Sequence, residues 1–328
     1  DMFVRSQRLA TTASRLVPVY VGLTGALWLL LLIAGDPPLL ALIHAMSTLA
    51  TSGISAVAGP SQAPSGMAGE MIIFCFLFFA LSRLTFSGDT RGLTRSRLRD
   101  DPEFRMGLLI VLALPLTLFL RHWIAAFDVG AEQNLGAGLR ALWGGLFMSL
   151  SFLTTTGFES GDWSAVRFWS GLETPGVILM GLAIIGGGVA TTAGGGKLLR
   201  IYALYLAGVR EMEKLVHPHS VGRSGVMARR IRRQGAFVAW VFFMMFAMSI
   251  AAISLAFALT GLDFENAMVM TIAGLTNCGP LIRVAAEQPV ILNELGATAK
   301  MIYAGAMVLG RLELLAIFVL LTPGIWRD

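Results

Sequence analysis

The chain has 328 residues, of which 55% are hydrophobic and only 14% are charged, and its formal net charge is +5. A soluble globular domain carries about 25% charged residues, so this composition excludes the ordinary soluble classes and indicates a membrane protein with several spans. Positive charge is also typical of nucleic-acid binding. Here the arginines cluster in short loops between apolar segments, which favours membrane lipids as the partner and no nucleic acid.

The apolar segments predict the secondary structure. A full-length span needs about 20 residues, and six segments suit this role, the fourth of them long and interrupted: roughly 16–35, 67–84, 107–127, 172–207, 236–260 and 298–321. Three shorter apolar segments lie between the two members of each pair, at 37–49, 139–153 and 264–275. Because these are too short to cross a bilayer, we expect re-entrant helices. The sequence therefore predicts an all-α membrane protein.

The distribution of Lys and Arg predicts the orientation. The loops after the second and fourth spans, and the stretch before the first, are rich in arginine. By contrast, 54–66 has no Lys or Arg, and 158–171 has only Arg167. Basic loops face the cytoplasm. Both ends of this chain are therefore predicted to be cytoplasmic, and the short helices are predicted to enter the membrane from the outside.

Each short segment ends in the same pattern, a leucine four residues before a glycine. The three endings are LATSGI (49–54), LTTTGF (153–158) and LTNCGP (275–280). The repeated unit is a span, a short helix, a polar turn and a second span, three times in one orientation. The turns could be ordinary glycine-containing connections. The repetition instead favours parallel units around an axis along the membrane normal, with the turns converging on a water-filled path.

The residue types in these turns suit a monovalent cation. They offer backbone carbonyls without fixed charge, which replace the hydration shell of such an ion, and glycine permits the angles that direct a carbonyl at the axis. A divalent site would more often use a carboxylate ring, and the turns contain no Asp or Glu. The predicted filter residues form a first turn (Thr51, Ser52, Gly53), a second turn (Thr155, Thr156, Gly157) and a third turn (Asn277, Cys278, Gly279).

The fourth span is interrupted by GGGVATTAGGGK at 186–197, which we call the gate loop. Each glycine costs a helix up to about 1 kcal/mol, so this stretch is predicted to be a loop that lines a cavity inside the membrane. Packing of small residues between helices is the alternative. A nucleotide-binding P-loop does not fit, because the G-x-x-x-x-G-K-[ST] pattern fails at Thr191 and Leu198.

Four features together resemble the Trk/Ktr/HKT superfamily of potassium transporters, and within it the bacterial Trk-type membrane subunit. They are the three turns, the stretch 186–201, the C-terminal apolar stretch 307–326, and the spacing of the repeated units. The resemblance covers essentially the whole chain. It implies potassium uptake across a bacterial inner (plasma) membrane by channel-like conduction, with K⁺ held by filter carbonyls and no further cofactor in this chain. It also implies a homodimer and a cytosolic nucleotide-binding regulatory subunit.

The resemblance further implies that the gate loop lies under the filter and controls conduction. The gate residues would be Gly186, Gly187, Gly188, Thr191, Thr192, Gly194, Gly195, Gly196, Lys197 and Arg311. A charge inside a span, as at Arg311, costs about 2.5–3.5 kcal/mol on insertion scales. The family places this arginine near the loop, where it would repel or delay a cation. Arg311 could instead snorkel or form a structural pair, and Lys197 could simply anchor its helix at the headgroups.

One feature departs from the family, which has four repeated units where this chain has three. The units at 1–100, 101–225 and 226–328 resemble the second, third and fourth of the family. We therefore expect the family's first unit to be absent from this chain, and the chain to be a fragment of a longer protein.

Other function classes fit less well. A secondary transporter coupled to Na⁺ or H⁺ would place more ionisable residues at mid-membrane, although a filter that also passes Na⁺ stays open. An enzyme is not expected, because the sequence has no G-x-S-x-G, no H-E-x-x-H and no paired mid-span aspartates.

Overall fold

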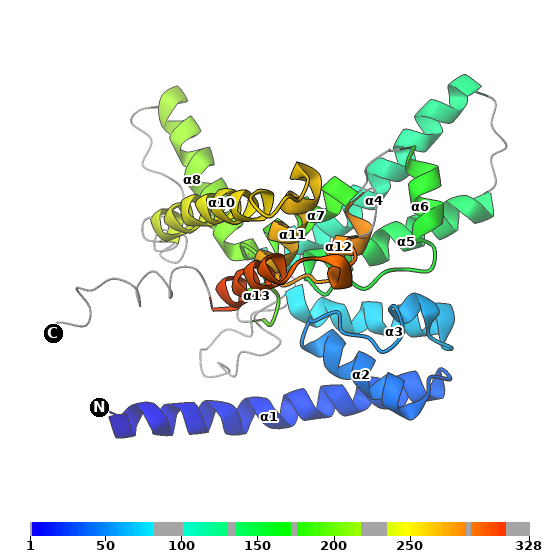
Figure 1. Cartoon of the computed structure of the whole chain (residues 1–328), viewed down its shortest axis with the longest axis horizontal. Coiled ribbons are helices and arrows are strands. Elements are labelled where there is room, and N and C mark those ends of the chain that lie inside the picture. The colour runs from blue at the N-terminus through cyan, green and yellow to red at the C-terminus, as the bar shows by residue number, and fades with distance from the viewer. Residues whose placement is uncertain are drawn as a thin grey trace.

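The structure, a computed structural model, describes residues 2–81, 101–129, 135–171, 176–189, 191–217, 235–286 and 290–312. Every regular element within these ranges is a helix (Figure 1). Three helical stretches are long and apolar enough to cross a membrane, Leu16–Ile33, Pro102–Arg121 and Ala236–Ala258. The prediction of an all-α membrane protein is confirmed. Most of the arginines used to predict the orientation lie in 82–100 and 218–234, outside the described residues.

The first group of helices comprises α1 (Met2–Ile33), α2 (Pro38–Leu49) and α3 (Gly66–Leu77), which continues as the 3₁₀ turn η2 (Phe78–Leu81). Gly35 has a φ of +105° and turns the chain between α1 and α2. Pro38 then starts α2, where a proline costs no helical hydrogen bond. A further 3₁₀ turn, η1, covers Pro60–Gln62. The short helix α2 packs against both α1 and α3.

The second group has the same order with additions: α4 (Pro102–Val129), α5 (Leu135–Leu153), α6 (Trp163–Ser170), α7 (Gly176–Ile185) and α8 (Leu198–Val216). Helix α5 packs against α4 and α7, as α2 packs against its neighbours. It begins at Leu135, earlier than the predicted 139, and is 19 residues long. The predicted fourth span is two helices, α7 and α8, separated by the gate loop.

The third group comprises α10 (Ala236–Ala258), α11 (Phe264–Thr276), α12 (Leu281–Val284), the 3₁₀ turn η6 (Leu292–Glu294) and α13 (Ala297–Arg311). Helix α11 packs between α10 and α13. The three groups join through contacts of α3 with α5 and of α7 with α11. Figure 1 shows α11 near the middle of the molecule and α1 along one edge.

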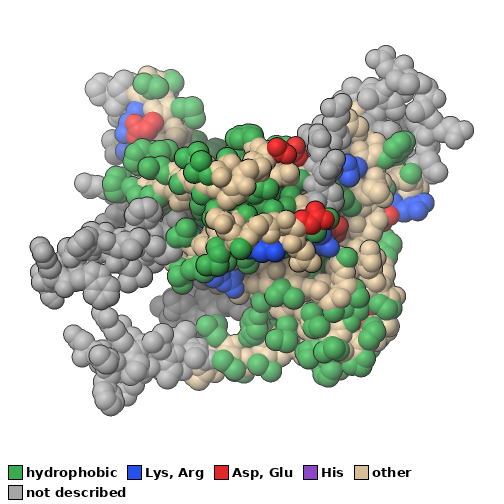
Figure 2. Space-filling model, in the orientation of Figure 1, with side chains coloured by type: hydrophobic (Ala, Val, Ile, Leu, Met, Phe, Trp, Pro, Cys, Tyr) green, Lys and Arg blue, Asp and Glu red, His purple; other side chains and the backbone are tan. Residues whose placement is uncertain are grey.

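Burial is distributed as expected for a protein whose solvent is hydrocarbon. The short helices carry buried polar side chains, among them Ser149 and Ser151 at 0% exposure. The spanning helices expose large apolar side chains instead, such as Val21 on α1 and Met248 on α10. Only 11% of the Leu16–Ile33 window is buried. Figure 2 shows hydrophobic side chains gathered over α10 and around α2 and α3. The core is therefore built around the short helices and their turns.

Candidate cation filter and gate

The three turns share one backbone conformation. Each short helix ends in a residue with left-handed φ, Thr51 at +47°, Thr155 at +57° and Asn277 at +55°. The amide of the next residue donates to the carbonyl five residues earlier, which is the Schellman motif. These bonds are Ser52 to Ser47 (3.0 Å), Thr156 to Ser151 (2.9 Å) and Cys278 to Ala273 (3.0 Å). The sequence repeat is thus a repeat of hydrogen-bonded geometry.

A left-handed threonine is unusual, because its branched side chain crowds the backbone, and such a residue costs on the order of 1–3 kcal/mol. Tertiary hydrogen bonds hold these residues in place. Thr155 Oγ1 accepts the Gly194 amide at 2.6 Å, and Thr51 Oγ1 donates to Thr192 Oγ1 at 2.9 Å. Asn277 Nδ2 donates to a carbonyl of α13 at 3.2 Å. Two of the three turns are therefore tied to the gate loop and the third to α13.

The turns meet one another closely. A Cβ on Gly53 would overlap the Thr156 carbonyl oxygen and lie 3.0 Å from Pro280 Cγ. A Cβ on Gly157 would lie 2.9 Å from Cys278 Sγ. Both glycines also have positive φ, +65° and +77°. The first and second turns therefore require glycine for conformation and for space.

The third turn differs from the other two. Gly279 is not among the residues with positive φ, and a Cβ there would have no neighbour within 4 Å. The expectation that glycine serves the same backbone purpose in all three turns is therefore wrong for Gly279. The left-handed residue of this turn is Asn277, and its buried neighbour Cys278 contacts the second turn.

A cavity of about 560 Å³ lies between the first and third turns. It reaches from Arg283, just after the third turn, to Arg311 at the end of α13. Backbone of both turns lines it, together with side chains of α13 such as Tyr303 and Met307. The first and third turns therefore border an open cavity along one side.

The gate loop is compact and closed at its base. The Gly196 amide donates to the Ile184 carbonyl at 2.8 Å, so the loop returns to the end of α7. Gly186 and Gly195 both have a φ of +74°, and a Cβ on either would overlap backbone across the base of the loop. The predicted interruption of the fourth span is confirmed. The glycines at the base of the loop let its two backbone segments touch.

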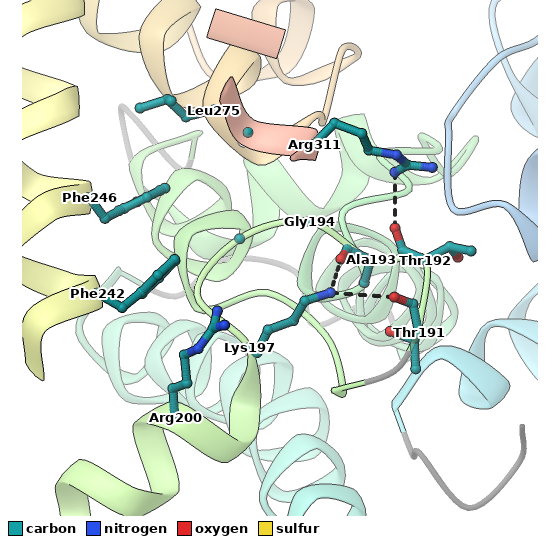
Figure 3. Close-up of a pocket in the computed structure, with 12 residues that line it drawn as sticks. Thr191, Thr192, Ala193, Gly194, Lys197, Arg200, Phe242, Phe246, Leu275 and Arg311 are labelled. Atoms are coloured by element: carbon teal, nitrogen blue, oxygen red, sulfur yellow. Dashed lines mark hydrogen bonds between the residues drawn. The ribbon is translucent and has the colours of Figure 1, made fainter. Parts of the chain in front are cut away.

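Two basic side chains, Lys197 and Arg311, donate hydrogen bonds to carbonyls of the gate loop (Figure 3). Lys197 Nζ donates to the carbonyls of Ala193 and Thr191. Arg311 Nη1 reaches from α13 to the Thr192 carbonyl at 3.1 Å. Three consecutive carbonyls of the loop are thus bound by positive side chains. The structure brings Arg311 and the gate loop together, as the family resemblance implied.

The loop also borders a second cavity, of about 270 Å³. The Arg200 guanidinium lies over the Phe242 ring at 4.2 Å from its centroid. The lining side chains shown in Figure 3 come from the gate loop, α8, α10, α11 and α13, and include Lys197, Arg200, Phe242, Phe246, Leu275 and Arg311. Positive charge therefore gathers around this cavity, and Arg311 also lines the cavity beside the first and third turns.

The sequence interpretation missed two acidic residues that contact the site. Glu70 on α3 binds the segment after the second turn, and Glu103 on α4 accepts the Val189 amide of the gate loop at 3.2 Å. Glu70 had a usable signal, since an ionisable residue within an apolar span is costly. Glu103 had none, because an acidic residue in the first turn of a helix is common.

In the described part of the chain, three short helices end in turns that contact one another and the loop between α7 and α8. The fold and this site define an all-α membrane protein. A family model described as TrkH, a cation transport protein, matches residues 104–324. The chain therefore belongs to the TrkH family.

Relatives of known name agree with this assignment. The chain is 33% identical to the Trk system potassium uptake protein TrkH of Salmonella typhimurium and 32% identical to that of Escherichia coli K12, each over 332 residues and 98% of this chain. The crystal structure of the potassium transporter TrkH from Vibrio parahaemolyticus matches 98% of the chain with a TM-score of 0.82 and 29% identity. The chain spans 64% of the length of the two named relatives and 66% of the crystallised chain. The relatives are named as transporters and not as enzymes, in line with the prediction.

Proposed function

We propose that this chain contributes to potassium uptake, and that its three turns form part of one selective ion path. The observation that carries the proposal is that the three turns share a Schellman geometry and touch one another. The relatives' names, which describe potassium uptake, support the choice of ion.

The ion would bind backbone carbonyls of the three turns. Each short helix directs its carboxyl-terminal, partly negative end at its turn, which favours a cation. The turn residues carry no carboxylate, so a weakly hydrated monovalent ion suits them better than a divalent one. The cavity between the first and third turns is where a further turn of the same kind would complete a ring.

The gate loop would block conduction in the conformation described here. It lies against the turns through Thr51 and Thr155, and Lys197 and Arg311 hold its carbonyls. Opening would require these bonds to break, and the positive charge of Arg311 near the path would also slow a cation. Small residues and positive-φ glycines give the loop the backbone freedom that such a movement needs.

The remaining assignments extend the family resemblance. They are three repeat units at 1–100, 101–225 and 226–328, a homodimer in a bacterial inner membrane, cytoplasmic chain ends, and a cytosolic nucleotide-binding regulatory subunit that docks on the basic inner loops.

The test is growth of bacteria that lack their own potassium-uptake systems, at low external K⁺, with the full-length protein supplied from a plasmid. The proposal predicts growth and K⁺ accumulation that depend on the protein. Wild-type protein that reaches the membrane but gives neither would contradict it. Expression with and without the regulatory genes of the same organism would show whether a partner is needed.

A further inference from the structure

Glu70 is a buried carboxylate that joins the first group of helices to the second. Its side chain projects from α3 and the residue is only 4% exposed. Oε1 accepts the Gly161 amide at 2.7 Å, and Oε2 accepts the Ser160 hydroxyl at 2.8 Å. The Trp143 indole of α5 donates to Oε2 at 3.3 Å. Three donors from the neighbouring unit therefore converge on one side chain.

Two of these donors belong to the outer limb, residues 158–161, which directly follows the second turn. The inner end of this limb is fixed by its own unit, since Ser151 Oγ donates to the Phe158 carbonyl at 2.9 Å. The third unit holds its other side, because Arg283 forms an ion pair with Glu159 at 3.0 Å and lies 3.4 Å from the Ala58 carbonyl of the first unit. The conformation of the outer limb is therefore set by contacts across units.

The chemistry of the site calls for a carboxylate. A buried carboxylate is costly unless its oxygens are bonded, and bonds to a charged acceptor are stronger than neutral ones. Glutamine would keep one acceptor oxygen and replace the other with a donor, so it would face at least one of the three donors with another donor. Glu70→Gln therefore keeps the size of the side chain but disrupts its hydrogen bonds.

We infer that Glu70 is a positioning residue of the ion filter, whose carboxylate fixes the outer limb and so the carbonyls that the second turn directs at the ion. The inference rests on the proposed function. Carbonyl selectivity depends on the number and geometry of the coordinating oxygens. Substitution of a residue that fixes one turn should therefore change the ion selectivity, even where the amount of folded protein stays the same.

The test measures Na⁺ and K⁺ flux through full-length protein reconstituted at equal amounts in liposomes. Glu70→Gln should raise the Na⁺/K⁺ flux ratio at least threefold. Ser160→Ala and Trp143→Phe each remove one donor and should raise the ratio less. Ser160→Ala combined with Glu70→Gln should add little to Glu70→Gln alone. The matched control is Glu211→Gln on the exposed face of α8, which should leave the ratio unchanged.

A ratio of fluxes is independent of how much protein folds, so a merely structural role would not move it. Glu70→Gln that elutes as the wild type does and keeps the wild-type ratio would overturn the inference. If that variant does not fold, unchanged ratios in both Ser160→Ala and Trp143→Phe would overturn it equally. Wild-type liposomes that pass no K⁺ would instead overturn the proposed function, and the inference with it.

Discussion

Thr155 offers the sharpest test of the proposed contact between filter and gate. Its hydroxyl, in a residue 1% exposed, accepts the Gly194 amide of the gate loop at 2.6 Å. Thr155→Val keeps the shape and the β-branched character of the side chain but leaves that amide without its acceptor. An unsatisfied donor costs about 1–3 kcal/mol, which changes an equilibrium by about 5-fold to 150-fold. If the bond is made only when the loop is closed, the open fraction rises by this factor until it saturates.

The assay is Rb⁺ or K⁺ flux into liposomes that contain the full-length protein alone, without any regulatory subunit. The control is Thr48→Val, because Thr48 is equally buried, but among the described residues its hydroxyl bonds to the His44 carbonyl of its own helix, at 2.7 Å, and not to the gate loop. We expect a raised basal flux for Thr155→Val and no comparable rise for Thr48→Val. Equal flux in the two folded variants would refute the reasoning, because the contact would then not hold the loop closed.

Three further predictions concern other parts of the path. Arg311→Ala removes the exposed guanidinium that binds the Thr192 carbonyl. Such a bond is worth about 1 kcal/mol or less at an exposed site, so basal flux should rise up to about fivefold. A folded variant with unchanged flux would count against a gating role. Gly53→Ala places a Cβ against the second turn, so K⁺ flux and the melting temperature should both fall, and normal values for both would show that the turns do not meet. Burial raises the pKa of Glu159 above that of an ordinary glutamate, although Arg283 opposes the rise. Acidifying the outer bath should therefore neutralise this carboxyl early and leave Arg283 unpaired, so that K⁺ entry slows; Glu159→Gln should be slow at all pH values, and a wild-type pH response that survives this substitution would exclude Glu159 as its source.

The sequence predicted the short helices and the broken span closely. The ranges 37–49 and 264–275 correspond to Pro38–Leu49 and Phe264–Thr276. Length and hydropathy suffice there, because a short apolar run bounded by proline or acidic residues has few alternatives. The start of α5 was missed, since its first residues, LGAG, are typical of a loop. Helix α6 was missed as well, because its tryptophans and phenylalanine follow polar residues without a long periodic pattern.

The parts that escaped prediction depend on contacts distant in sequence. The left-handed conformation of Thr51 and Thr155 contradicts local preference and is maintained by bonds to residues 192 and 194. Glu70 reaches a segment about 90 residues away along the chain. A single sequence records neither pairing. The filter and gate assignments themselves stay predictions, now with a geometry that mutations can test.

The central claim is that the three turns select a cation by their carbonyls. The most direct measurement is the relative flux of K⁺, Rb⁺, Na⁺ and Li⁺ through the full-length protein in liposomes, each ion tested at the same concentration. The account predicts that K⁺ and Rb⁺ pass readily, that Na⁺ and Li⁺ lag behind them, and that Gly157→Ala reduces this difference, because a Cβ there would press on Cys278 of the third turn. Equal permeation of all four ions through the wild-type protein would contradict it.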